Sequence, residues 1–163
     1  MDHIVYISVG SNMGNRLENC KFGIAELVRN GKSVLMDLSR FYVTEPVDYQ
    51  DQDWFVNAVF KIKTDLVPSV LFEKIRRIQQ NAGRPEDAIR FGPRILDMDI
   101  LFYDDGLMNT KELIIPHPRM HKRRFVLKPI CDIAPDMVHP MLKKSMKHLL
   151  DQLDEHSQKV FLY

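Results

Sequence analysis

The sequence is poor in cysteine and contains no long apolar run. Its 163 residues include two cysteines, Cys20 and Cys131, and no CxxC pair. A secreted domain of this size usually carries a framework of spaced cysteines, so a disulfide scaffold is not expected. No run of 18 apolar residues is present, which excludes a transmembrane helix. The chain opens directly into a strand-like segment without a signal-peptide pattern, so we expect a cytoplasmic protein.

The sequence also lacks an excess of either charge. It has 23 basic and 22 acidic residues, for a formal net charge of +1. General nucleic-acid and membrane-surface binders usually show a large basic excess, so neither partner is expected. Hydrophobic residues make up 45% of the chain and charged residues 28%, a mix typical of a globular protein. The length predicts a single domain over residues 1–163, and we expect a monomer.

Apolar periodicity predicts alternating strands and helices over the first 103 residues. Strands are expected at 3–10, 33–44, 55–63 and 95–103. One helix is expected between Asn15, which has capping-box spacing to Glu18, and Gly31. A second should begin at Pro68 and end near Gly83. The order βαββαβ predicts an α+β, ferredoxin-like fold, an antiparallel sheet with helices packed on one face. An appended C-terminal region adds a short apolar segment at 113–116 and helices at 120–133 and 145–153.

Two aspartates interrupt the apolar pattern of the fourth expected strand. Side chains alternate along a strand, so Asp97 and Asp99 share one face. The apolar residues Leu96, Met98, Ile100 and Phe102 share the other. Aspartate is disfavoured in strands and like charges on one face repel, but a divalent cation removes that repulsion. Carboxylate oxygens suit Mg²⁺, which keeps water and phosphate oxygens as its other ligands. The alternative is the solvated outer face of an edge strand.

Basic residues cluster in sequence on both sides of this aspartate pair. Arginine forks match phosphate oxygens in two-point hydrogen bonds, so acidic metal ligands flanked by arginines are typical of a site for a magnesium–polyphosphate complex. No P-loop or protein-kinase motif is present, and the six histidines lack zinc-site spacing. The flanking basic residues are Arg84, Arg90 and Arg94 on one side, and Arg119, Lys122, Arg123 and Arg124 on the other.

The segment Gly92–Leu101, GPRILDMDIL, resembles the signature of the 6-hydroxymethyl-7,8-dihydropterin pyrophosphokinase family. These folate-pathway enzymes transfer pyrophosphate from ATP to the hydroxymethyl group of the pterin, which yields AMP and the pterin diphosphate. Further segments resemble the family in the same order, at 10–15, 41–47, 55–58, 115–125 and 133–135. The resemblance therefore spans nearly the whole chain.

The resemblance implies a role for each matching residue on the nucleotide side. Asp97 and Asp99 would hold two Mg²⁺ ions that bridge the phosphates of the co-substrate ATP. Arg84 and Arg94 would be catalytic residues in a loop that closes over the triphosphate. The remaining ATP-binding residues would be His117 and Arg123, which contact phosphates, and Ile100 and Leu113, which line the adenine pocket.

The resemblance also implies the pterin-binding residues. Phe55 and Phe125 would sandwich the ring, and Asn57 would hydrogen-bond its polar edge, together with backbone groups near Thr44 and Val47. A pterin is flat and rimmed by donors and acceptors, so two aromatic faces and an amide suit its chemistry. Ordinary core packing is the alternative for both phenylalanines.

Four positions depart from the family pattern. Phe91 stands where tryptophan is common, and Phe55 where tyrosine is common. Gln79 stands where glutamate is usual, which removes any carboxylate role there. Glu86 replaces a residue that is often basic, a change that would weaken contacts to ATP.

Two other functions remain open from the residues themselves. One is a non-enzymatic ferredoxin-like module that binds RNA, which would need exposed aromatic side chains on a basic sheet face. Asp97 and Asp99 would repel RNA phosphates. The other is a different Mg²⁺-dependent nucleotidyl or phosphoryl transferase, against which the aromatic pair and Asn57 favour a pterin.

Overall fold

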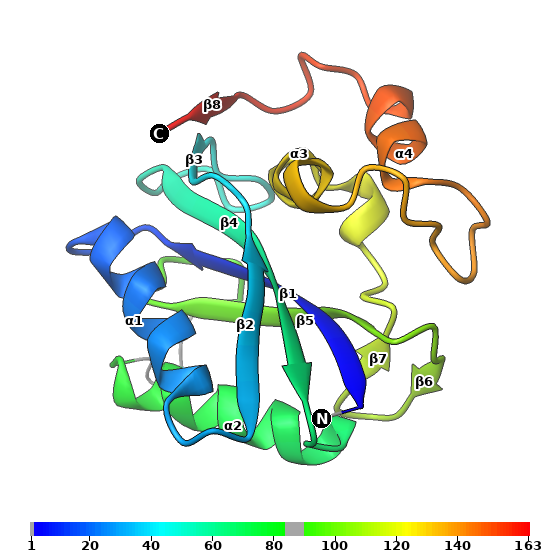
Figure 1. Cartoon of the computed structure of the whole chain (residues 1–163). Coiled ribbons are helices and arrows are strands. Elements are labelled where there is room, and N and C mark those ends of the chain that lie inside the picture. The colour runs from blue at the N-terminus through cyan, green and yellow to red at the C-terminus, as the bar shows by residue number, and fades with distance from the viewer. Residues whose placement is uncertain (1, 84–89) are drawn as a thin grey trace.

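The computed structural model describes residues 2–83 and 90–163 and is built around one antiparallel sheet (Figure 1). The path β5–β1–β4–β3–β8 runs across the sheet, and β2 also pairs with β4. All strand pairs are antiparallel. The strands are β1 (His3–Ser11), β2 (Ser33–Leu38), β3 (Tyr42–Thr44), β4 (Phe55–Thr64), β5 (Asp97–Tyr103) and β8 (Val160–Leu162).

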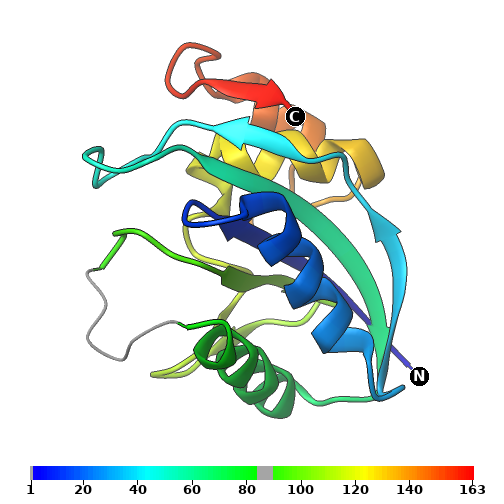
Figure 2. The ribbon, with the colours of Figure 1, turned by 90° about the vertical axis from the view of Figure 1, so that its left-hand side faces the viewer.

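Helices cover both faces of this sheet. α1 (Arg16–Val28) and α2 (Pro68–Asn81) lie on one face, and α3 (Arg124–Ile133) and α4 (Met146–Gln152) lie on the other (Figures 1 and 2). Alternate β1 residues divide between the layers, since Ile7 packs with α1 and α2 while Tyr6 packs with α3 and α4. The predicted α+β fold is confirmed, and the appended region supplies the second helical layer. A small hairpin, β6 (Met108–Asn109) with β7 (Ile114–Ile115), follows β5.

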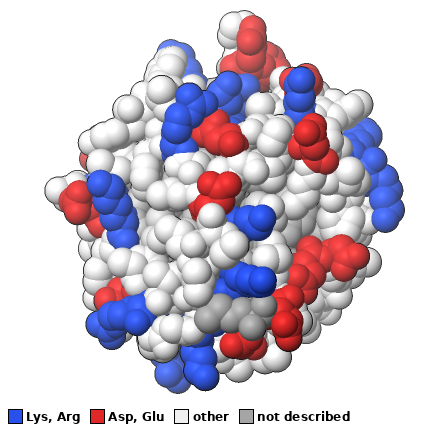
Figure 3. Space-filling model, viewed as in Figure 1, with Lys and Arg blue, Asp and Glu red and all other residues white. Residues whose placement is uncertain are grey.

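The helix boundaries follow the expected signals. The Asn15 side chain accepts a hydrogen bond from the Glu18 backbone N–H at 3.3 Å and caps α1. Pro68 occupies the first turn of α2, where its missing N–H costs no hydrogen bond. No helix in the described residues is long and apolar enough to cross a membrane. The molecular face in Figure 3 carries acidic and basic side chains interspersed.

The strand expected over 33–44 is instead two strands, β2 and β3. Ser39 causes the break, because its hydroxyl oxygen accepts a hydrogen bond from the Val59 N–H at 2.9 Å. A side chain thereby takes the place of the backbone acceptor that a continuous ladder would supply. The chain then turns through Arg40 before β3 resumes pairing with β4.

Two further expectations are corrected. The helix expected over 120–133 begins at Arg124, because Arg123 has extended backbone dihedrals of φ −116° and ψ 104°, and Met120–Lys122 forms only a 3₁₀ turn. Phe102 does not share a face with Ile100. A shift in the β1–β5 register between Tyr6 and Ile7 inserts an extra residue into β5, and Phe102 turns toward the α3 and α4 layer.

Candidate active site

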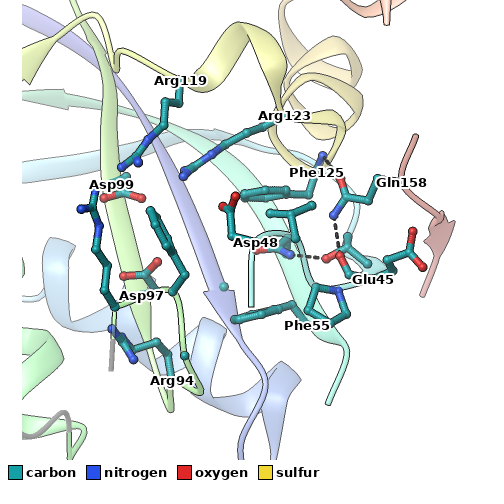
Figure 4. A pocket seen from close by; sticks show the side chains of 18 of the residues that line it. Glu45, Asp48, Phe55, Arg94, Asp97, Asp99, Arg119, Arg123, Phe125 and Gln158 are labelled. Carbon is teal, nitrogen blue, oxygen red and sulfur yellow. Dashed lines mark hydrogen bonds between the residues drawn. The ribbon is translucent and has the colours of Figure 1, made fainter. Parts of the chain in front are cut away.

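A cavity of about 270 Å³ opens where β1 ends and where β4 and β5 begin, near the start of α3. The loop after β3, the segment before β5 and the C-terminal segment complete its wall. All five residues expected to bind pterin line it: Thr44, Val47, Phe55, Asn57 and Phe125. Figure 4 shows Phe55 and Phe125 on opposite sides of this space. The structure therefore brings together two aromatic faces with a gap between them.

A buried amide and hydroxyl lie beside this gap. Asn57 Nδ2 donates a hydrogen bond to Thr44 Oγ1 at 2.6 Å, and both residues are buried. Gly10 pairs with Asn57 across β1 and β4. A Cβ at position 10 would overlap Asn57 Oδ1 and lie 3.3 Å from Asn57 Cγ. Glycine is therefore required at position 10 by the close approach of the Asn57 side chain.

Asp97 and Asp99 enter the same cavity from β5. They pair with Gly10 and Ser8 of β1, so both carboxylates lie on one face of the strand, as alternation predicts. β5 is an edge strand, but these side chains line a cavity and do not lie on an open outer face. In Figure 4, Arg119 and Arg123 extend toward Asp99. Negative and positive side chains thus meet at one end of the cavity.

A second cavity, of about 210 Å³, adjoins the first and contains the expected adenine-binding residues. Ile100 and Leu113 line it, together with Phe72 and Ile75 from α2. Asp99 and His117 line both cavities. The aspartate at this junction can therefore face groups held in either space. Lys111 and Glu112 add charged groups to the wall of the second cavity.

His117 is electrically neutral near pH 7. Burial, followed by the nearby Arg123 and Arg119, lowers the pKa of His117 to about 4. Its Nδ1 accepts a hydrogen bond from the Arg119 N–H at 3.1 Å, which leaves the proton of the neutral ring on Nε2. That nitrogen lies 4.0 Å from Asp99 Oδ2. His117 can therefore donate a hydrogen bond at the junction without adding charge.

Aromatic rings hold three of the cavity arginines in place. The guanidinium carbons of Arg90 and Arg119 lie 4.7 and 4.9 Å from the centroid of the Phe91 ring. Arg123 lies 5.3 Å from the Phe125 centroid, and burial lowers its pKa. Phe91 thus supplies the aromatic surface of the tryptophan that is common at this position.

Asn12, after β1, connects two segments that border the cavity. Its Oδ1 accepts from the Arg94 N–H at 2.8 Å. Its Nδ2 donates to Gln52 Oε1 at 3.0 Å and to the Asp53 carbonyl at 2.9 Å. Gln52 in turn donates to the Phe91 carbonyl at 2.8 Å. Through these hydrogen bonds, the turn from β1 to α1 joins the 48–54 segment to the 90–94 segment.

Arg94 and Gln79 lie close to the aspartate pair. Arg94 is buried and lines the first cavity. Gln79 Oε1 accepts from the Met98 N–H at 2.8 Å, so its amide fixes the backbone between the two aspartates. Arg84 and Glu86 lie outside the described residues, and their expected roles stay predictions.

The aspartate pair fits a hard divalent cation. Asp97 and Asp99 present two carboxylates on one face of β5, and arginines line the same cavity. Carboxylate oxygens are ligands of the type that Mg²⁺ prefers. Within residues 2–83 and 90–163, no group of three Cys, His, Asp or Glu side chains is arranged to hold a metal. Water and substrate oxygens would therefore have to complete the coordination.

Several cavity-lining residues were given no role from the sequence, among them Glu45, Asp48 and Gln158. Glu45 and Asp48 follow β3, and Gln158 comes from the C-terminal segment. Glu45 and Asp48 flank Val47, so the expected pterin loop could have indicated them. Gln158 lies 33 residues in sequence from Phe125, whose backbone N–H it contacts, and no local pattern indicates it.

Known proteins resemble this chain in both sequence and fold. The family model described as "7,8-dihydro-6-hydroxymethylpterin-pyrophosphokinase (HPPK)" matches residues 6–135. This chain belongs to the HPPK family. The match includes Asp97 and Asp99, the arginines Arg94, Arg119 and Arg123, and the five residues expected to bind pterin.

HPPK relatives occur both as separate proteins and as parts of longer ones. The chain is 36% identical over 151 residues to the 2-amino-4-hydroxy-6-hydroxymethyldihydropteridine pyrophosphokinase of Haemophilus influenzae, with 93% of each chain covered. It is 40% identical over 158 residues to a folic acid synthesis protein of Pneumocystis carinii. That match covers 97% of this chain and spans about a fifth, 21%, of the longer relative.

A solved structure shares the HPPK fold. The wild-type HPPK-DHPS of Plasmodium falciparum, crystallised with pterin and p-hydroxybenzoate, matches with a TM-score of 0.73 at 16% identity. The match covers 92% of this chain and 41% of that one. At this identity the likeness establishes the arrangement of sheet and helices.

Proposed function

We propose that this chain transfers pyrophosphate from ATP to the hydroxymethyl group of 6-hydroxymethyl-7,8-dihydropterin. One observation carries the proposal: the aromatic gap and the second cavity meet at Asp99 and His117. A pterin in the first cavity and a nucleotide in the second would place hydroxyl and phosphates at that junction. Family membership supports the choice of these two substrates.

The first cavity is suited to orient the pterin. Phe55 and Phe125 would stack on its two faces, and Asn57 would hydrogen-bond its polar edge. The Asn57–Thr44 hydrogen bond fixes the amide before substrate arrives, which lowers the entropy lost on binding. The pterin ring would then hold its hydroxymethyl group toward the aspartate end.

The second cavity is suited to the nucleotide. Ile100 and Leu113 would contact the adenine, while Arg94, Arg119 and Arg123 would face the phosphates. His117 would donate from Nε2 to a phosphate oxygen. Asp97 and Asp99 would hold Mg²⁺, two ions by family resemblance, which would neutralise phosphate charge when bound.

In the reaction, the hydroxymethyl oxygen attacks the β-phosphorus of ATP. A bond forms between that oxygen and the β-phosphorus, and the bond from the β-phosphorus to the oxygen bridging the α-phosphate breaks. AMP leaves with the electron pair, and the hydroxyl proton is released. The arginines stabilise the charge that develops on the phosphoryl oxygens, and positioning supplies much of the rate enhancement.

An AMP-release assay tests this function. The purified chain is mixed with ATP, Mg²⁺ and 6-hydroxymethyl-7,8-dihydropterin, and each component is omitted in turn. The proposal predicts AMP only when all three are present. ADP in place of AMP would indicate a simple kinase, and no turnover by the folded chain would contradict the proposal.

A further inference from the structure

The C-terminal segment after residue 153 closes one side of the aromatic gap. This segment lies beyond the residues matched by the family model, which end at 135. Within it, Gln158 is 4% exposed and lines the first cavity. A nearly buried amide in an otherwise exposed segment requires hydrogen-bond partners, and those partners belong to the cavity wall.

The Gln158 side chain connects two walls that are distant in sequence. Its Oε1 accepts a hydrogen bond from the backbone N–H of Phe125, the residue whose ring is expected to stack on the pterin, at 3.1 Å. Its Nε2 donates to the Glu45 carbonyl at 2.6 Å, between Thr44 and Val47 (Figure 4). The donor and acceptor atoms of one amide are thus used on opposite partners, a combination that few side chains can provide.

Neighbouring contacts anchor this amide. The Glu45 backbone N–H donates a hydrogen bond to the Lys159 carbonyl at 2.9 Å, and the Glu45 side-chain Oε1 accepts one from the Lys159 N–H at 3.1 Å. β8 then pairs with β3. The ring of Phe161 stacks on Trp54, with centroids 6.1 Å apart and planes at 11°. Trp54 immediately precedes Phe55, so the C-terminal segment contacts the Phe125 backbone on one side of the gap and the residue next to Phe55 on the other.

We propose that Gln158 is a positioning residue for pterin binding. By joining the Phe125 backbone to the Glu45 backbone, it fixes the separation between the stacking ring and the loop that faces the pterin edge. This inference rests on the proposed function. The nucleotide cavity shares none of these hydrogen bonds, so the effect of Gln158 is confined to the pterin side.

Binding measurements on two variants test this role. Gln158→Met keeps the side-chain length and removes both hydrogen bonds. Gln158→Glu keeps the acceptor and loses the donor while ionised, but regains it when protonated. Pterin affinity is measured by calorimetry, and ATP affinity is measured separately with Mg²⁺ and a non-hydrolysable analogue. Trp54 is the single tryptophan, so its fluorescence reports the docking of Phe161.

We expect Gln158→Met to weaken pterin binding about tenfold and to leave ATP affinity within about twofold of wild type. Burial and the facing Glu45 carbonyl should raise the pKa of a carboxyl at position 158. Relative to wild type at each pH, Gln158→Glu should therefore bind pterin weakly at pH 8 and recover as the pH falls toward 4. Gln152→Met is the matched control, because Gln152 is exposed on α4 and does not line the cavity, and it should change neither affinity.

Three results would overturn the inference. The first is a Gln158→Met variant that binds pterin with an affinity within twofold of wild type. An equal loss of pterin and ATP affinity, which indicates a purely structural role, is the second. If Gln158→Met does not fold, the absence of pH-dependent recovery in Gln158→Glu decides against it. A wild-type chain that binds ATP but no pterin would instead refute the proposed function, and this inference with it.

Discussion

Gly10→Ala is expected to damage the pterin cavity by displacing the Asn57 side chain. The new methyl would occupy the space of Asn57 Oδ1, and the β1–β4 pairing prevents the backbone from moving away. Asn57 would have to rotate, which breaks its 2.6 Å hydrogen bond to Thr44 and misplaces the amide that faces the pterin. The perturbation therefore acts through one buried side chain.

The magnitude follows from the hydrogen bonds at stake. The substitution removes the Asn57–Thr44 hydrogen bond and the one or two that Asn57 is expected to form with the pterin. At about 1 kcal/mol for each neutral hydrogen bond, the loss is about 2–3 kcal/mol. This loss corresponds to pterin binding weakened roughly 30- to 150-fold. Overpacking should also lower the free energy of unfolding by about 1–3 kcal/mol. Calorimetric titration with pterin measures the first effect, and thermal denaturation measures the second.

A double-mutant cycle isolates the cause. In an Asn57→Ala background the obstructing amide is absent, so Gly10→Ala should have little further effect on pterin affinity. Full additivity of the two substitutions would refute the reasoning. A Gly10→Ala protein that binds pterin within twofold of wild type would refute it equally.

Three other substitutions have distinct expected outcomes. Asp97→Ala should abolish AMP formation while circular dichroism shows an intact fold, and near-normal turnover would contradict the metal assignment. Asn12→Ala should reduce turnover about tenfold or more, because it removes the hydrogen bonds that hold the segments of Arg94 and Gln52 beside the cavity. Unchanged steady-state kinetics would argue against this role of Asn12. Asp132→Asn should cost about 2–3 kcal/mol in urea denaturation near pH 7, since Asp132 accepts from Arg40 and Tyr42. Hydrogen bonds from these residues lower the pKa of Asp132 despite its burial, so its contribution is present above about pH 4 and lost as pH falls. The wild-type advantage should therefore shrink in acid, and a constant difference between pH 7 and pH 3 would contradict this.

Much of the fold could be predicted because local signals agreed with tertiary packing. The Asn15 cap, the Pro68 start and the strands expected at 3–10 and 55–63 each match the structure. The break at Ser39 could not be predicted, since it depends on a hydroxyl that accepts a hydrogen bond from Val59, 20 residues away. The bulge that moves Phe102 to the other face of β5 arises from the pairing with β1, and the β5 sequence contains no pattern that indicates it.

The candidate site could be predicted where its residues belong to one strand or one motif. Alternation alone placed Asp97 and Asp99 together, and the family resemblance added the aromatic pair. Gln158 was missed because its partner Glu45 lies 113 residues away and because the last strand is only three residues long. Contacts that close a cavity across such separations depend on the tertiary fold.

The most direct test of the account is whether both cavities can be occupied at once. The chain is saturated with Mg²⁺ and a non-hydrolysable ATP analogue, and 6-hydroxymethyl-7,8-dihydropterin is titrated into it by calorimetry. We predict that one pterin binds per chain while the nucleotide stays bound, because the two spaces share only the junction at Asp99 and His117. Displacement of the nucleotide by the pterin would show that the substrates compete for one cavity and would contradict the proposed transfer between them.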